Sequence, residues 1–115
     1  MDGKIHEKLG EVSIADEVIA SIAGLAATET RGVYALGGNI LHDQITFSRS
    51  KSLSKSVRVH VDGNAVSLKV ALVLDGSVPI PVVSKDAAER VRNAVESMTG
   101  MEVEDIRITV AGVKA

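Results

Sequence analysis

The sequence predicts an α+β fold, a two-layer sandwich with two main helices packed on one face of a small, mostly antiparallel sheet. Apolar residues recur at helical spacing in segments 14–27 and 80–98. Segments 57–62 and 65–74 alternate apolar and polar residues around Gly63-Asn64, and residues 106–111 alternate in the same way. A chain of 115 residues suits one hydrophobic core. We therefore expect a flexible leader over residues 1–9 and a single domain over residues 10–115.

The first helix is expected to begin after Ser13, which can cap it, with Asp16 in the capping-box position. Its small residues Ala20, Gly24 and Ala27 make it thin, so it can lie close to the layer it covers. Gly32 can take the left-handed conformation that ends helices. The apolar positions of this helix are Ile14, Val18, Ile22, Leu25 and Ala26, widened by Ala15, Ile19 and Ala23.

A short extended segment, residues 33–36, leads into a Ser-, Lys- and Arg-rich stretch over residues 39–56. We expect a long loop here, with one helical turn. Phe47 is its expected anchor in the core.

The hairpin is the clearest pattern in the chain. A two-residue turn at Gly63-Asn64 places Val61 opposite Val66, and a slip of one residue would move the apolar side chains to the wrong face. On the other face, Arg58 then lies opposite Lys69. The remaining expected pairs are Val59 with Leu68, Val57 with Val70, and His60 with Ser67.

The second helix is expected to start near Pro79 and Pro81 and to end at Gly100. Its expected apolar face consists of Ile80, Val83, Ala87, Val91, Ala94, Val95 and Met98, and its exposed flank pairs Asp86 with Arg90 and Arg92 with Glu96. In the closing strand, Ile106, Ile108 and Val110 face the core, and Arg107, Thr109 and Ala111 face outward. We expect the strands to form a meander, although the sequence leaves their order open.

Composition excludes several classes of function. Thirteen Lys and Arg against fifteen Asp and Glu give a net charge of −2, so no global field attracts a polyanion. Two aromatic residues, Tyr34 and Phe47, are too few for recognition of bases by stacking. The absence of cysteine fits a reducing cytoplasm. The longest apolar run, residues 14–27, is too short to span a bilayer and contains two acids, so we expect no direct membrane insertion.

Catalytic and metal-binding patterns are absent from the sequence. His6, His42 and His60 lack metal-ligand spacing, and His60 with Asp62 on one strand face is weak support for a metal. There is no GxSxG elbow, phosphate loop or GxGxxG motif. We therefore expect no catalytic residues, no cofactor and no metal, and a protein that is not an enzyme.

Basic residues on the open sheet face are the main candidate for a contact surface. Arg58, Lys69 and Arg107 are expected there, and Arg90 and Glu96 are candidate interface residues on the flank of the second helix. Such a patch suits an acidic protein surface, acidic headgroups or nucleic acid. An ordinary charged surface explains the same residues about equally well. Nucleic acid is disfavoured, because the chain lacks the GxxG loop of the similar KH domains.

The order of these signals resembles a known family. Gly10-Glu11-Val12-Ser13-Ile14 before the first helix, Arg31-Gly32-Val33 after it, the valine hairpin, and the closing run AVESMTGMEVEDIRITVAGV (residues 94–113) are similar to the alkaline shock protein family, also called the Gls-type envelope stress response family of Gram-positive bacteria. The resemblance covers residues 10–113. The chain differs from many members at Asp75-Gly76 and Ala87-Ala88.

The resemblance implies a non-enzymatic cytoplasmic protein that acts in the envelope stress response. It would be a self-associating scaffold or interaction module, recruited to the cytoplasmic face of the membrane by a membrane-anchor protein of the same family. Two alternatives stay open: a small nucleic-acid-binding domain that uses the basic loop and sheet face, and an adaptor that regulates an enzyme of lipid metabolism. The sequence does not give the oligomeric state, the partner or the inducing stress. It also does not show whether residues 39–56 are ordered.

Overall fold

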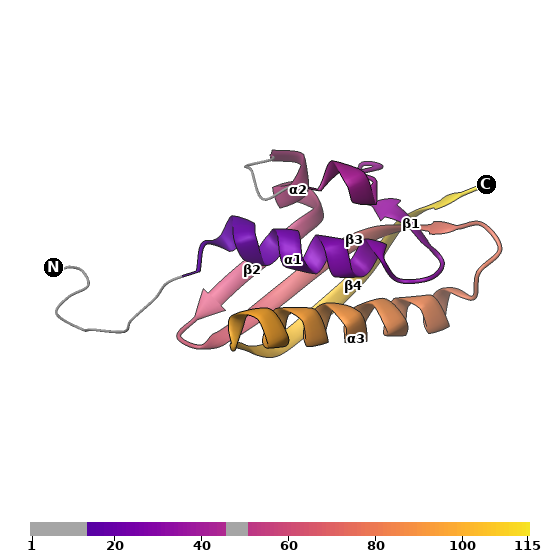
Figure 1. The fold of residues 1–115 in the computed structure, drawn as a ribbon. Helices are drawn as coiled ribbons and strands as arrows, with labels where there is room; N and C mark the ends of the chain where they lie inside the picture. The colour runs from indigo at the N-terminus through magenta and orange to yellow at the C-terminus, as the bar shows by residue number, and fades with distance from the viewer. Residues whose placement is uncertain (1–13, 46–50) are drawn as a thin grey trace, which may run out of the picture.

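The computed structural model describes residues 14–45 and 51–115 and has the predicted α+β architecture (Figure 1). Helices α1 (Asp16–Thr28) and α3 (Ile80–Thr99) lie side by side over one face of a four-stranded sheet. In this part of the chain no helix covers the other face. The remaining elements are the strands β1 (Val33–Leu36), β2 (Val57–Asp62), β3 (Ala65–Asp75) and β4 (Glu102–Lys114), the 3-10 turn η1 (His42–Gln44) and the short helix α2 (Lys51–Ser56).

Strand β3 is the centre of the sheet and pairs with the other three strands. The predicted hairpin register is confirmed, with Val61 opposite Val66 and Arg58 opposite Lys69. Both β1 and β2 run antiparallel to β3, so two of the three pairings fit the predicted, mostly antiparallel sheet.

Strand β4 runs parallel to β3, and the expected meander is wrong at this point. The reason lies in the connection: α3 carries the chain back along the sheet before β4 begins, and a long crossover of this kind joins parallel strands. Glu102 therefore pairs with Ala65 at the start of β3, and Lys114 pairs with Asp75 at its end.

The core lies between β3 and the two helices. Every side chain of β3 that faces the helices is buried, namely Val66, Leu68, Val70, Leu72 and Leu74. From α3, Val83, Ala87, Val91 and Val95 are buried against them. Ile80 and Met98 were expected on this face but are 44% and 66% exposed. They lie in the first and last turns of a 20-residue helix about 30 Å long, where its ends extend past the buried centre.

The first helix is thin, as predicted. The side chains of Leu36, Ile45 and Leu53 lie 3.2–3.5 Å from the position that a Cβ at Gly24 would occupy. Ile45, directly after η1, and Leu53, within α2, are both buried and anchor the long connection between β1 and β2. This connection contains η1 and α2 where one helical turn was expected. Phe47, the expected anchor, lies outside the described residues.

The start of α1 differs from the prediction. The helix begins at Asp16 with Ala15 as its N-cap residue, and no side chain caps it. Ser13, the predicted cap, lies outside the described residues. At the other helix, Gly100 adopts a left-handed conformation (φ 74°) and ends α3 as predicted.

Two side chains of α3 hold the start of β4. The Arg92 guanidinium donates a hydrogen bond to the Val103 carbonyl (2.7 Å), and the Val103 N–H donates one to Oε2 of Glu96 (2.9 Å). Arg92 and Glu96 were expected to pair with each other on an exposed flank. Both instead bind the backbone of one strand residue, which fixes β4 to the helix layer.

Replacing Glu96 with alanine removes the acceptor for the half-buried Val103 N–H. We expect E96A to lower the free energy of unfolding by about 1–3 kcal/mol, measured by urea denaturation, and to speed amide exchange at Val103. The control is E89A on the exposed side of the same helix, which should stay within about 0.5 kcal/mol of the wild type. Equal effects of the two changes would contradict the role given to Glu96.

Replacing Gly32 with alanine introduces both strain and a clash. Its φ is +96°, and an added Cβ would lie 2.9 Å from Cγ2 of the buried Val83. We expect G32A to destabilise the protein by about 2 kcal/mol or more, seen as a lower urea midpoint. Alanine at Gly112, where a Cβ has nothing within 4 Å, is the matched control and should change the midpoint little.

Candidate interaction surface

Three basic side chains form one row across the uncovered face of the sheet. Lys69 of β3 lies directly opposite Arg58 of β2 on one side and Arg107 of β4 on the other. All three are exposed. On the helix side of the same strands, Val57, Leu68 and Val70 are buried and Val59 is half-buried. Strands in a sheet lie about 4.8 Å apart, so the Cα atoms of the three residues span about 10 Å. We call Arg58, Lys69 and Arg107 the cation row.

The side chains around Lys69 on this face are small. Ser67 and Ala71, two residues before and after Lys69 in β3, are half-buried and point to the same side. A partner surface could therefore approach the strand closely on both sides of the row. Like charges that lie directly opposite each other destabilise a sheet slightly, so the row does not serve the stability of the fold.

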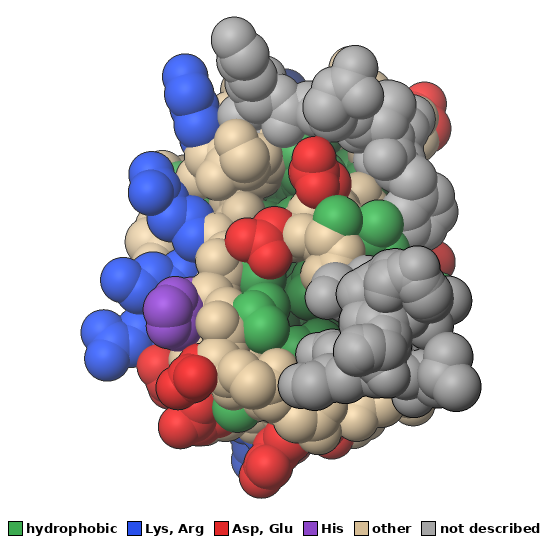
Figure 2. All heavy atoms as spheres, turned by 90° about the vertical axis from the view of Figure 1, so that its left-hand side faces the viewer, with side chains coloured by type: hydrophobic (Ala, Val, Ile, Leu, Met, Phe, Trp, Pro, Cys, Tyr) green, Lys and Arg blue, Asp and Glu red, His purple; other side chains and the backbone are tan. Residues whose placement is uncertain are grey.

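Acidic side chains lie next to the cation row on the side of the β2–β3 hairpin turn. Asp62 ends β2, and Asp105 lies near the start of β4 with its carboxylate 3.5 Å from the Arg107 side chain. Figure 2, which looks onto the hairpin end of the molecule, shows Lys and Arg side chains in a column along the left edge, with a histidine among them and acidic side chains below. The face is thus banded, with positive and negative zones, and not uniformly basic.

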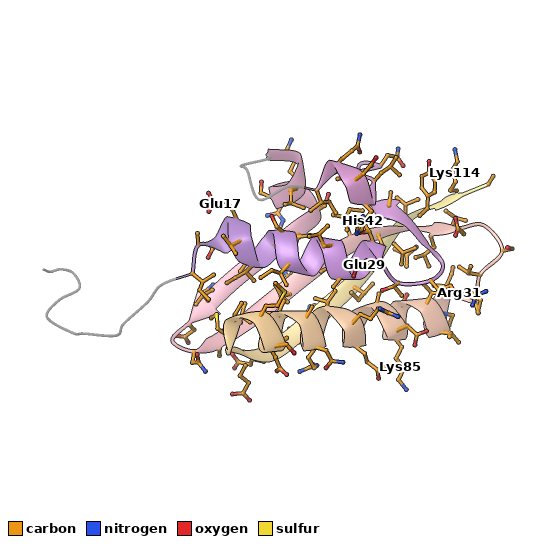
Figure 3. All side chains as sticks on the ribbon, in the orientation of Figure 1. Glu17, Glu29, Arg31, His42, Lys85 and Lys114 are labelled. Atoms are coloured by element: carbon orange, nitrogen blue, oxygen red, sulfur yellow. The ribbon has the colours of Figure 1, made fainter. Side chains whose placement is uncertain are left out.

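The far end of the sheet carries one contact that the sequence did not reveal. The Lys114 ammonium lies 5.4 Å from the centre of the Tyr34 ring, a cation–π distance. Tyr34 lies in β1, and Lys114, labelled in Figure 3, lies at the end of β4, so only the parallel course of β4 brings them together.

Arg90 and Glu96, the two candidate residues of α3, lie apart from the cation row, because α3 covers the opposite face of the sheet. Arg90 is exposed and lines an open groove between α1 and α3. Glu96 is half-buried and binds the Val103 N–H. The structure therefore unites three of the five predicted interface residues and separates the other two.

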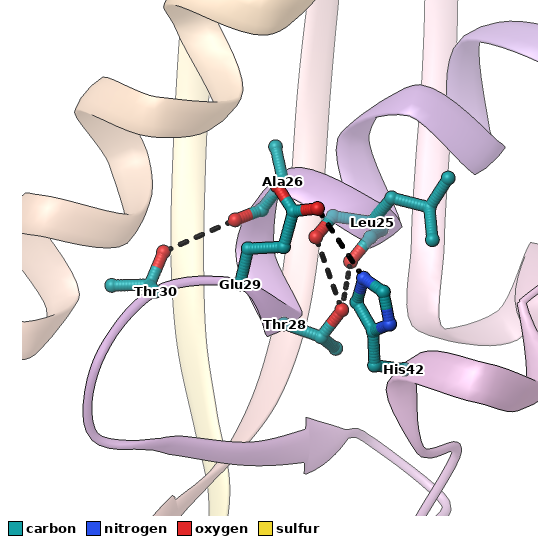
Figure 4. Close-up of polar contacts among 7 residues, drawn as sticks. Leu25, Ala26, Thr28, Glu29, Thr30 and His42 are labelled. Carbon is teal, nitrogen blue, oxygen red and sulfur yellow. Dashed lines mark hydrogen bonds and ion pairs between the residues drawn. The ribbon is translucent and has the colours of Figure 1, made fainter.

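Beside the groove between α1 and α3, the two threonines at the end of α1 serve the fold. Thr28 donates to the carbonyls of Gly24 (2.9 Å) and Leu25 (3.1 Å), and Thr30 donates to that of Ala26 (3.2 Å), which closes the last turn of α1 (Figure 4). Glu29 lies 3.4 Å from His42 of η1. Because both side chains are about half exposed, this pair ties η1 to α1 only weakly.

No helix of the described residues is long and apolar enough to cross a bilayer. Over the same residues, no three side chains of the metal-ligating types lie together.

Solved structures with a similar fold include several variants of the MamM CTD. One, a copper form, has a TM-score of 0.56 and 13% identity, and covers 87% of this chain and 100% of its own. A nickel form has a TM-score of 0.54 and 13% identity, with 85% and 99% covered. At this identity the likeness shows a shared fold.

Sequence relatives come from Gram-positive bacteria. The uncharacterized protein YqhY of Bacillus subtilis (strain 168) is 32% identical over 106 residues, 92% of this chain and 78% of the relative. Spy1614 of Streptococcus pyogenes serotype M6 is 31% identical, with 99% and 96% covered. YloU of Bacillus subtilis is 27% identical, with 99% and 97% covered.

A family model matches residues 4–115, nearly the whole chain. It includes the hairpin, α3 and the closing strand on which the resemblance was first noted. The chain therefore belongs to the alkaline shock protein 23 family, which is described as having a cell envelope-related function.

Proposed function

We propose that this protein is a non-enzymatic interaction module of the cell envelope, which self-associates and is recruited to the cytoplasmic face of the membrane by a protein anchor of the same family. The uncovered sheet face is the docking surface, and the anchor presents an acidic patch to it. Membership of a family with a cell envelope-related function supports this role.

The observation that carries the proposal is the cation row. Arg58, Lys69 and Arg107 lie in one register on three strands, exposed and free of any covering helix in the described part of the chain. Small neighbours on β3 leave the row accessible to a flat surface. A complementary acidic patch would steer the encounter and fix its orientation.

The banding of the face favours a protein partner over nucleic acid. A phosphate backbone that follows the cation row would also meet Asp62 and Asp105 at the border. A protein can match both zones, with acids over the row and a base over the border, and this complementarity gives specificity.

The recruitment is tested with a charge-reversal variant. In R58E/K69E/R107E, capture of the anchor from detergent-solubilised membranes should fall roughly tenfold or more, because each reversed pair loses about 0.5–1 kcal/mol. The matched control, R31E/K85E/R90E, makes the same change in net charge at exposed positions on the helix side of the molecule and should bind like the wild type.

Identification of the captured protein completes the test. The anchor must belong to the same family, contain a membrane-spanning segment and bind the purified chain directly. Equal capture by both triple variants would contradict the assignment of the sheet face. Binding of the wild type to protein-free anionic vesicles, lost in R58E/K69E/R107E, would contradict recruitment by a protein.

Nucleic acid remains the second candidate because of the same three cations. If the chain bound RNA or DNA through the row, electrophoretic retardation would appear at low salt and weaken steeply as salt rises. We expect no retardation at low salt. Retardation by the wild type that disappears in R58E/K69E/R107E would contradict the proposed function and favour nucleic-acid binding.

A further inference from the structure

The outer edge of β4, the strand that also carries Arg107 of the cation row, is unpaired in the described part of the chain. This strand is 13 residues long, and among the described residues it pairs with β3 alone. An edge strand presents unpaired N–H and C=O groups to which another strand can add. Proteins usually cover or interrupt such edges, so a long free one requires an explanation.

Helix α3 protects only the start of this edge. Arg92 and Glu96 occupy the carbonyl and the N–H of Val103, so no strand can pair there while these bonds are intact. Beyond this point β4 runs away from α3 toward the C-terminal end (Figure 1). Exposure follows the same course: Val103 is buried, the apolar residues in the middle of the strand are half-buried, and Val113 is 52% exposed.

The apolar side chains of β4 form a palindrome centred on Ile108. Reading outward from the centre, the side chains that face the helix layer are Ile106 and Val110, then Val103 and Val113. From Ile106 to Val103 and from Val110 to Val113 the spacing is three residues, where a regular strand has two. Two β-bulges add the extra residue on each side and leave Glu104 and Ala111 without a partner in β3. The bulges thus preserve the symmetry of the pattern.

We propose that the edge of β4 pairs antiparallel with the same edge of a second copy, around a two-fold axis at Ile108. Ile106 of each copy then lies opposite Val110 of the other, and the apolar pairs share one face. Each bulged segment lies opposite the other bulged segment, so both strands contribute equal numbers of residues. This inference rests on the self-association in the proposed function and names its surface.

Two further features favour a second copy as the occupant. Backbone pairing would span residues 105–111 of each strand, because Arg92 and Glu96 block Val103. Beyond that ladder, the acidic side chains of Glu102 and Glu104 would lie near Lys114 of the other copy, so opposite charges approach at both ends. The end that α3 covers in one copy would also lie beside the end that α3 leaves uncovered, where Val113 is exposed. An unrelated strand offers neither match.

The test uses single cysteines, because the chain has none of its own. Opposed residues in antiparallel strands have Cα atoms about 4.5–5.5 Å apart, within the range that a disulfide bridges. Under mild oxidation I108C should form a disulfide-linked dimer. I106C alone should not, because its own copy is displaced by about 13 Å along the strand, whereas a mixture of I106C and V110C should cross-link.

The control V61C places the thiol on an exposed position of β2, at the opposite edge of the sheet, and should stay monomeric on non-reducing gels. If a cysteine variant fails to fold, V110K serves instead. It places a charge near the axis and should raise the dissociation constant of the oligomer at least tenfold in sedimentation experiments, and V82K on exposed α3 should not.

The outcomes separate this inference from the proposed function. An oligomeric wild type in which I108C does not cross-link and V110K stays associated would overturn the β4 pairing and leave self-association intact. A wild type that is monomeric at all concentrations would overturn the pairing together with self-association, while the membrane-capture experiment would still decide recruitment. Cross-linking of V61C in place of I108C would place the contact between copies at the β2 edge of the sheet and would reject the β4 pairing.

Discussion

The burial of one side of β3 under two helices is the interaction on which the rest of the structure depends. Five consecutive helix-facing side chains of β3, from Val66 to Leu74, are at most 1% exposed, and β3 is also the strand to which all the others bind. Each such side chain contributes about 1.5–3 kcal/mol when fully buried, so this row is the centre of the hydrophobic core. The helices can cover only one side, and the side chains of β3 alternate. The other face is therefore left for polar residues.

That uncovered face connects the fold to the proposed role. The hairpin register that buries Val57 opposite Val70 also places Arg58 opposite Lys69, because both pairs belong to the same ladder. The closing strand then adds Arg107 in line. Core packing thus fixes the spacing of the cation row, and a rigid sheet holds the three charges with little freedom of the backbone. Such preorganisation lowers the entropy cost of binding a partner.

Helix α3 has two consequences that bear on assembly. As the crossover between β3 and β4 it makes the closing strand parallel and leaves that strand at the edge of the sheet. Through Arg92 and Glu96 it also covers the first residues of the edge and leaves the rest open. Partial protection of this kind restricts strand addition to one segment, and a restricted segment can specify one register where a fully open edge would permit several.

The sequence by itself determined the two layers, the hairpin register and the lack of a recognised catalytic pattern, because these depend on local periodicity and on residue types. The helix-facing valines could pair in only one register without exposing their side chains, so Arg58 and Lys69 were placed correctly from sequence. Tertiary structure decided the direction of β4, the separation of Arg90 and Glu96 from the cation row, and the use of Arg92 and Glu96 on Val103. These features depend on where a 20-residue helix returns the chain relative to β3. The amphipathic pattern of that helix specifies which face is buried, but it does not specify which edge of the sheet the following strand will join.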